Sequence, residues 1–412
     1  MTRPAACRHC GAALTHTFCD LGMSPLSNSF LDPASLNQME RFYPLHAYVC
    51  DRCFLVQLQE FESPERIFGD YAYFSSYSQT WLDHARAYTG EMVARFGFSR
   101  ASQVIEIASN DGYLLQYFKA RGVPVLGIEP AANVAKVAQE AGIPTLVEFF
   151  GVKLATELRA QGTQADLLLG NNVLAHVPDL NDFVAGLKIA LKPAGVITME
   201  FPHLLRLIEE NQFDTIYHEH FSYFSLTTVE QVFARHGLKL FDVEALPTHG
   251  GSLRIFSTHA EDAGRVGGER IGRVKAEEER AGLRGLAAYR AFAEKVKQTK
   301  RRLLEFLVEA KNAGKTIAGY GAPAKGNTLL NYCGIRTDFI DYTVDLSPHK
   351  QGRYLPGTHI PICAPERVRE TRPDYLLVLP WNIRDEIIAQ MAYIREWGGQ
   401  FVLPIPEVRV VP

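Results

Sequence analysis

The segment Gln103-Val104-Ile105-Glu106-Ile107-Ala108-Ser109-Asn110-Asp111-Gly112 decides the fold, because an apolar run passes directly into a short polar turn. Residues 103–108 have the β-branched, apolar character of a buried strand, and a stretch with helical spacing follows the turn. A strand, a tight turn and a helix N-terminus together form a common cradle for a nucleotide cofactor. The segment therefore predicts a cofactor-binding unit, with an ordinary strand-to-helix connection as the alternative.

Further strand patterns follow this segment and alternate with helical stretches such as residues 182–191. Short apolar or alternating runs predict strands at residues 124–128, 166–170, 195–200, 239–244 and 252–258. Alternation of this kind is typical of an α/β protein with a doubly wound parallel sheet. The last two runs flank a glycine-containing turn, so we expect an antiparallel end to that sheet.

Polar residues follow the predicted strands at the edge where ligands bind in such sheets. Glu129 comes directly after strand 124–128, in the place of an acidic group that accepts hydrogen bonds from ribose hydroxyls. The predicted cofactor site comprises Glu106, Ala108, Asn110, Asp111, Gly112, Glu129, Asn171 and Asn172.

Residues 214–224 bring two imidazoles, a carboxylate and a phenol together in the run Tyr217-His218-Glu219-His220. Histidine can take or give a proton near neutral pH, and tyrosine and glutamate are natural partners for it. The run lies after strand 195–200 and before a predicted helix at residues 227–236, so we expect it over the carboxyl ends of the strands. We interpret it as a proton-transfer site; a metal site or a structural aromatic turn is the alternative. Simple alternation points His218 away from its neighbours.

Two C-x-x-C pairs near the N-terminus predict a zinc site formed by Cys7, Cys10, Cys50 and Cys53. Four cysteine ligands leave no open coordination position, so the expected zinc is structural. The chain has seven cysteines, an odd number, which favours metal binding in a reducing compartment over disulfides. Reduced thiol pairs in two turns are the alternative.

The carboxyl-terminal part begins with a charged helical region at residues 269–313, which we expect to be a solvated connector. A second strand and turn follow at residues 316–328, and the backbone of such a turn suits a phosphate. The turn could bind a nicotinamide dinucleotide or a nucleotide-linked substrate, and the unusual glycine spacing favours the substrate. The predicted substrate-binding residues are Gly321, Lys325, Asn327 and Lys350.

The length of 412 residues and 47% hydrophobic content predict two to four domains, which we place at residues 1–68, 69–260 and 261–412. A net charge of −3 disfavours nucleic acid and anionic membranes as partners. We find no secretory signal and no apolar run of about 18 residues, and therefore expect a cytoplasmic protein. The oligomeric state is open, and a monomer is compatible with the sequence.

The central motifs resemble those of class I S-adenosylmethionine-dependent methyltransferases. The resemblance rests on Glu106-x-Ala108-x-Asn110-x-Gly112, on Glu129 and on residues 173–178. Ala108 and Asn110 stand where that class usually has glycine. With the cysteine pairs, Tyr217-x-Glu219-His220 and residues 319–326, the chain resembles nucleotide-sugar C-methyltransferases of deoxysugar biosynthesis from Cys7 onward.

This resemblance implies an N-terminal zinc-binding domain, a central class I methyltransferase sheet and a carboxyl-terminal Rossmann-like α/β domain. It implies S-adenosylmethionine and structural zinc as cofactors and a small nucleotide sugar as substrate. The family's active-site residues map here onto Tyr71, His176, Tyr217, Glu219 and His220.

The expected chemistry is methylation of a 4-keto nucleotide-deoxysugar, with C3′ the favoured carbon. His220 would remove the C3′ proton, Tyr217 would donate a hydrogen bond to the enolate oxygen, and Glu219 and His176 would orient the reacting groups. Three alternatives remain: an O- or N-methyltransferase, a nicotinamide-dependent oxidoreductase, and a zinc-binding protein that has lost its activity.

Overall fold

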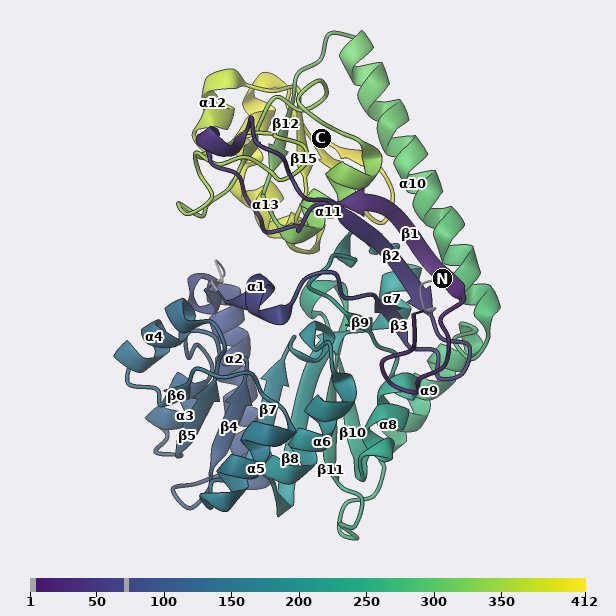
Figure 1. The fold of residues 1–412 in the computed structure, drawn as a ribbon. Helices are drawn as coiled ribbons and strands as arrows, with labels where there is room; N and C mark the ends of the chain where they lie inside the picture. The colour runs from purple at the N-terminus through teal and green to yellow at the C-terminus, as the bar shows by residue number, and fades with distance from the viewer. Residues whose placement is uncertain (1–4, 70–73) are drawn as a thin grey trace.

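The computed structural model describes residues 5–69 and 74–412, which form three sheets joined by helices (Figure 1). The central sheet has seven strands in the order β10-β11-β8-β7-β4-β5-β6. β11 runs antiparallel to β8 and β10, and the other neighbours pair in parallel. The predicted doubly wound sheet with an antiparallel end is confirmed. Its strands are β4 (Val104–Ile107), β5 (Val125–Ile128), β6 (Thr145–Leu146), β7 (Ala165–Asn171), β8 (Leu191–Pro202), β10 (Leu238–Leu246) and β11 (Ser252–His259).

The chain moves outward from β4 through β5 to β6 and then returns to place β7 on the other side of β4. The switch point between β4 and β7 therefore lies where their carboxyl ends meet, the expected place for a ligand. Helices connect these strands: α2 (Gln79–Phe96), α3 (Leu115–Ala120), α4 (Ala132–Glu140), α5 (Val152–Ala160), α6 (Leu180–Ala190), α7 (Leu204–Glu209) and α8 (Leu226–Arg235).

The N-terminal region forms a four-stranded sheet in the order β1-β2-β3-β9. β1 (His16–Ser24), β2 (Tyr43–Val49) and β3 (Val56–Leu58) come from this region, whereas β9 (Ser222–Tyr223) directly follows the Tyr-His-Glu-His run. The zinc-binding region and the predicted proton-transfer loop therefore share one sheet. Three of the zinc cysteines also lie in the same hydrophobic cluster as the methyltransferase core.

The carboxyl-terminal sheet has six strands in the order β14-β13-β12-β15-β16-β17, parallel except for β17. Its switch point lies between β12 and β15, as in a Rossmann-like domain. The elements are β12 (Ile317–Tyr320), α11 (Ala324–Cys333), β13 (Thr343–Val344), β14 (Ile362–Cys363), α12 (Arg367–Thr371), β15 (Tyr375–Val378), α13 (Arg384–Gln390), β16 (Gln400–Leu403) and β17 (Arg409–Val411).

The connector consists of two helices, α9 (Glu269–Arg280) and α10 (Leu286–Asn312), and is less solvated than its charge predicts. α10 runs beside β1 in Figure 1, and its Phe292 ring stacks on Phe18 with centroids 4.7 Å apart. Glu278 of α9 is fully buried and accepts hydrogen bonds from His203 and from the backbone at the start of α8. One acidic residue of the charged region thus holds α9 to the methyltransferase domain, which charge counting alone did not predict.

The segment between β1 and β2 leaves the N-terminal sheet and reaches the carboxyl-terminal domain, as the purple chain beside the yellow domain in Figure 1 shows. Leu31 forms a β-bridge with Tyr354, and the Asn327 amide donates to the Ser27 carbonyl at 2.6 Å. This crossing joins the first and last parts of the chain directly.

Within residues 5–69 and 74–412, no helix combines the length and apolar character that crossing a membrane requires.

Candidate active site

The turn after β4 adopts glycine-like backbone conformations without the glycines. Ala108 has φ 54° and Asn110 has φ 50°, a left-handed region in which most side chains are disfavoured. Gly112 has φ 78°, and a Cβ there would lie 2.9 Å from the Ile143 side chain. Ala108 and Asn110 therefore adopt the positive φ values that glycine usually provides at these two positions of the motif.

Hydrogen bonds brace this turn from two sides. Glu129 accepts from the Asn110 N–H at 3.0 Å through one carboxylate oxygen, and from the Ala131 N–H at 2.9 Å through the other. The Asn110 side chain accepts from the Ser75 N–H at 2.8 Å, so the start of the short 3-10 helix η2 (Ser75–Tyr77) is anchored on the turn. Tyr71, which precedes this segment, lies outside the described residues, and its predicted role stays a prediction.

Glu106, near the end of β4, belongs to the predicted cofactor site. S-adenosylmethionine carries a positively charged sulfonium and a positively charged ammonium, so an acidic side chain at this place suits it. The side chain is fully buried, and neither carboxylate oxygen has a hydrogen-bond partner among the described residues. Burial, followed by the charges of Asp111 and Glu129, raises the pKa of Glu106 well above its ordinary value. The Tyr113 hydroxyl opposes this rise only weakly, and Glu106 forms no ion pair with any described residue, so the buried carboxyl fits a cationic cofactor that supplies the missing charge.

The predicted catalytic histidines lie side by side. His176, in the 3-10 helix η3 (Leu174–His176) after β7, has its ring centroid 4.7 Å from that of His220. The Tyr217 ring lies on His220 with centroids 4.0 Å apart. The Phe221 N–H donates to the Ala175 carbonyl at 2.7 Å, so the backbone next to each histidine is joined directly.

Both histidines are held in the neutral form. Burial, with a further contribution from His176, lowers the pKa of His220 well below its ordinary value. Burial lowers the pKa of His176 to about 4. The Nδ1 of His220 lies 2.9 Å from the Thr215 carbonyl, which can only accept, so Nδ1 carries the proton and Nε2 keeps its lone pair.

Glu219 joins the Tyr217-His218-Glu219-His220 run to the segment between β1 and β2. Its carboxylate accepts a hydrogen bond from the Asn28 amide at 2.7 Å, and burial raises the pKa of Glu219 to about 7. Asn28 belongs to the segment that crosses to the carboxyl-terminal domain. His218 instead turns toward β2, where its Nε2 lies 3.3 Å from the Pro44 carbonyl.

Lys325 and Asn327 of the carboxyl-terminal turn each form a hydrogen bond to another segment. The Lys325 ammonium donates to Asn382 at 2.7 Å and lies 4.5 Å from the centre of the Trp381 ring, whose N–H donates to Asp214 at 2.7 Å. Burial lowers the pKa of Lys325 to about 8 and raises that of Asp214 to about 6. Asn327 binds the Ser27 carbonyl, as described above.

Gly321 and Lys350 lie together at the carboxyl end of β12. Gly321 has φ 88°, and a Cβ there would lie 2.5 Å from Pro380, so glycine is required. Lys350 donates to the Ala322 carbonyl at 3.0 Å. Of the four predicted substrate residues, Gly321 and Lys350 thus lie at the carboxyl end of β12, and Asn327 is bound to the N-terminal segment through Ser27. Besides burial, the charge of Lys325 contributes to the lowered pKa values of His220 and His249.

Reasoning from sequence missed His249, in the 3-10 helix η5 (Thr248–Gly250) between β10 and β11. Its Nε2 lies 3.1 Å from the amide of Asn172, and its ring lies 5.3 Å from Trp81. Both His249 and Asn172 have positive φ values, 54° and 56°, which is uncommon for residues other than glycine. Asn171, beside them, reaches the Tyr113 hydroxyl at 3.5 Å. The sequence did carry one signal for this residue: His249 stands directly before two glycines in the connection between two predicted strands.

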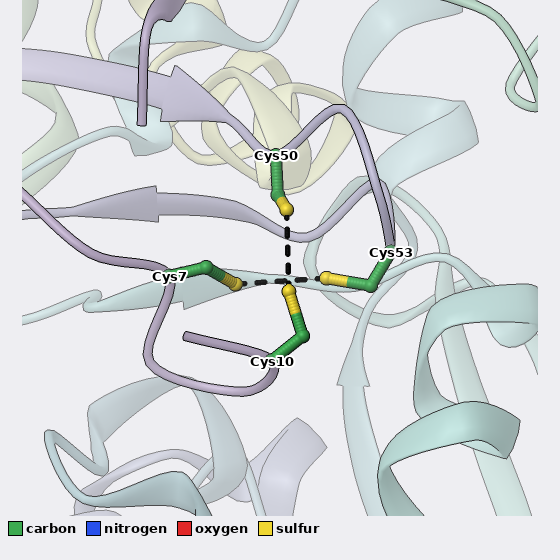
Figure 2. Close-up of side chains that lie close together, drawn as sticks. All are labelled: Cys7, Cys10, Cys50 and Cys53. Atoms are coloured by element: carbon green, nitrogen blue, oxygen red, sulfur yellow. Dashed lines mark hydrogen bonds between the residues drawn. The ribbon is translucent and has the colours of Figure 1, made fainter. Parts of the chain in front are cut away.

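The four cysteine side chains converge on one point (Figure 2). The Cys7 and Cys53 sulfurs are 3.6 Å apart, those of Cys10 and Cys50 are 3.5 Å apart, and all four lie within 4.8 Å of one another. A tetrahedral Zn²⁺ with bonds of about 2.3 Å separates its sulfur ligands by about 3.8 Å. The geometry fits zinc, and Cys19 is buried elsewhere, in β1.

Three family models match the chain in order. A zinc binding domain model matches residues 7–68, a methyltransferase domain model matches residues 81–243, and a C-methyltransferase C-terminal domain model matches residues 247–406. The C-methyltransferase NovU from Streptomyces niveus is 36% identical over 405 residues, which cover 98% of this chain and 96% of that protein.

Two solved structures each match just under half of the chain. The PH0226 protein from Pyrococcus horikoshii OT3 is 16% identical with a TM-score of 0.38, covering 48% of this chain and 99% of that one. Magnesium protoporphyrin IX methyltransferase from Synechocystis PCC 6803 is 13% identical with a TM-score of 0.34, covering 47% and 88%. The three models and the match to NovU along nearly the whole chain show that this protein belongs to the C-methyltransferase family and is an S-adenosylmethionine-dependent enzyme with a zinc-binding domain.

Proposed function

We propose that the enzyme methylates C3′ of a 4-keto nucleotide-deoxysugar, with His220 as the base that removes the C3′ proton. The observation that carries this proposal is the state of His220: a half-buried, neutral imidazole whose Nδ1 proton is held by the Thr215 carbonyl. A base in this state can accept a proton on Nε2 without first losing one. Methyl transfer to carbon needs such a base, because a ketone acidifies the neighbouring C–H bond without ionising it.

Tyr217 and His176 supply the surroundings in which charge can develop. We assign Tyr217 to donate a hydrogen bond to the C4′ oxygen as the enolate forms, since its ring already lies on His220. His176 is neutral and packs against His220, so it limits the directions in which the base can turn. Bound S-adenosylmethionine supplies the electrophilic methyl group that C3′ takes.

Glu106, Glu129 and the turn between them would hold that cofactor at the carboxyl ends of β4 and β5. Asp111, Asn171 and Asn172 complete the predicted set at the switch point. The buried carboxyl of Glu106, which forms no ion pair with a described residue, supports the assignment, because a cationic group nearby would relieve the cost of its ionisation.

We assign the nucleotide part of the substrate to the carboxyl-terminal domain. Gly321 and Lys350 lie at the carboxyl end of β12, the edge where such a domain binds ligands. Lys325 donates to Asn382 and Asn327 donates to the Ser27 carbonyl, and direct contact with substrate stays a prediction for both.

A panel of dTDP-, GDP- and CDP-linked 4-keto-deoxysugars, incubated with the enzyme and S-adenosylmethionine, tests the substrate class. Mass spectrometry should show a gain of one methyl group on at least one of them, and NMR should place it on C3′. A methyl group found on oxygen or nitrogen would contradict the proposal. The His220→Asn variant should turn over about 10²–10⁴-fold more slowly with unchanged affinity for S-adenosylmethionine.

A further inference from the structure

The first cysteine pair encloses an arginine whose backbone and side chain bind different parts of the protein. Arg8 lies between Cys7 and Cys10, and its backbone N–H donates to the Gln57 side chain at 2.9 Å. The amide of Gln57 donates in turn to the Cys7 sulfur at 3.2 Å. The position of Arg8 is therefore tied to a zinc ligand through the chain and through Gln57.

The Arg8 side chain leaves the zinc site and reaches the catalytic loops. Its guanidinium donates to the Pro178 carbonyl at 2.7 Å and also to the Leu58 carbonyl. It lies 5.4 Å from the centre of the Phe221 ring, within the range of a cation–π contact. One side chain thus contacts three separate segments.

Two of these contacts are next to the catalytic histidines in the chain. Pro178 is two residues after His176, and Phe221 directly follows His220. The Phe221 backbone closes the arrangement, since its N–H donates to Ala175 at 2.7 Å and its carbonyl accepts from the Leu58 N–H at 3.0 Å.

We propose that Arg8 is a positioning residue, which fixes the two histidine-bearing loops against each other and makes the zinc site part of the catalytic framework. This inference rests on the proposed roles of His176 and His220. It gives the zinc-binding domain a role in the reaction beyond its own folding, since the zinc ligands fix the point from which Arg8 extends.

Arginine suits this task better than lysine. Its planar group sends two N–H donors in fixed directions and stacks on an aromatic face, whereas a lysine ammonium is a compact point charge. The guanidinium of arginine stays charged at neutral pH. The carbonyl oxygens of Pro178 and Leu58 therefore accept from the same cation, and both lose a hydrogen-bond donor if it moves away.

The second cysteine pair offers a matched control, because Arg52 lies between Cys50 and Cys53 with its side chain 78% exposed. We compare Arg8→Met and Arg8→Lys with Arg52→Met, using the best 4-keto substrate of the panel above. Arg8→Met should lower kcat about 10–100-fold, because a small misplacement of reacting groups costs up to about 10²-fold. Zinc should remain at one ion per chain, and affinity for S-adenosylmethionine should stay within about twofold. Arg8→Lys should fall between wild type and Arg8→Met, and Arg52→Met should match wild type.

A second readout needs no substrate. In proteins labelled with ¹³C at histidine, the imidazole signals of His176 and His220, assigned with His176→Asn and His220→Asn, should shift in Arg8→Met and stay unchanged in Arg52→Met. Unchanged signals, or turnover within twofold of Arg52→Met, would overturn the inference. If Arg8→Met does not fold, Arg8→Lys is judged by the same two readouts.

Different results would refute His220 as the base and Arg8 as the positioning residue. Wild-type turnover by His220→Asn would refute the proposed base, and Arg8 would then be judged on the imidazole signals alone. A slow His220→Asn beside a fast Arg8→Met would leave the base intact and overturn the role of Arg8.

Discussion

Replacing Asn28 with alanine should change the pH dependence of catalysis, although Asn28 lies in sequence far from the predicted catalytic run. The Asn28 amide donates to the Glu219 carboxylate at 2.7 Å, and burial raises the pKa of Glu219 to about 7. The hydrogen bond opposes burial, because it stabilises the charged carboxylate. Its loss must therefore raise the pKa of Glu219 further.

The size of the change follows from the strength of such a bond. A hydrogen bond to a charged group contributes about 1.5–3 kcal/mol, and a change of one pH unit in pKa corresponds to about 1.4 kcal/mol. Asn28→Ala should therefore raise the pKa of Glu219 by roughly 1–2 pH units. If the carboxylate form orients the reacting groups, activity rises with pH through this pKa, and the rise should move to higher pH.

The assay is the pH profile of kcat/KM between about pH 5.5 and 9.5 for the wild type, Asn28→Ala and the exposed control Asn37→Ala. The acidic limb of the Asn28→Ala profile should move upward by roughly 1–2 pH units, and the control should overlay the wild type. An Asn28→Ala profile with an unmoved limb would refute the role given to Glu219. A uniform loss at all pH values would show that Asn28 acts through folding alone.

Three further predictions concern stability and the cofactors. Glu278→Ala should lower the melting temperature of the methyltransferase domain by roughly 6–20 °C, because leaving the buried donors of His203 and the α8 backbone without their acceptor costs about 3–5 kcal/mol. The exposed neighbour Glu279→Ala should change it little in scanning calorimetry. Although burial alone raises the pKa of Glu278, His203 and Thr227 hold it below its ordinary value, so this difference should shrink as the pH falls below about 4.5. Glu106→Gln should weaken S-adenosylmethionine binding about 10–100-fold in calorimetry without loss of thermal stability, and equal affinity would remove Glu106 from the site. Cys50→Ser should lose zinc by atomic absorption, because a serine hydroxyl does not replace a thiolate, and retention of one ion per chain would contradict the four-cysteine site.

The parts of the fold that local patterns describe were predictable. Strand β4, the turn at Gly112 and the alternating strands β10 and β11 all follow from apolar periodicity and turn chemistry within a few residues. The central sheet was therefore within reach, including its antiparallel end. The backbone at Ala108 kept the conformation of the missing glycine, which residue type alone does not reveal.

The contacts that assemble the site were not predictable, because they join residues far apart in the chain. Strand β9 pairs with β3 across more than a hundred residues, and it is too short to give a periodic signal. Asn28 and Arg8 look like ordinary loop residues until the fold brings them to Glu219 and Pro178. Glu278 lies in a charged run, where nothing local distinguishes a buried carboxylate from a solvated one.

In the proposed reaction, His220 removes a proton from carbon before methyl transfer. This step is tested most directly by incubating the 4-keto nucleotide sugar with enzyme in D₂O, with S-adenosylhomocysteine in place of S-adenosylmethionine, and following the C3′ proton by NMR. The C3′ signal should disappear with wild-type enzyme, at a rate at least about 10²-fold above that of His220→Asn and of the enzyme-free control. A C3′ proton that persists with the wild type, under conditions in which S-adenosylmethionine gives a methylated product, would contradict the proposed step.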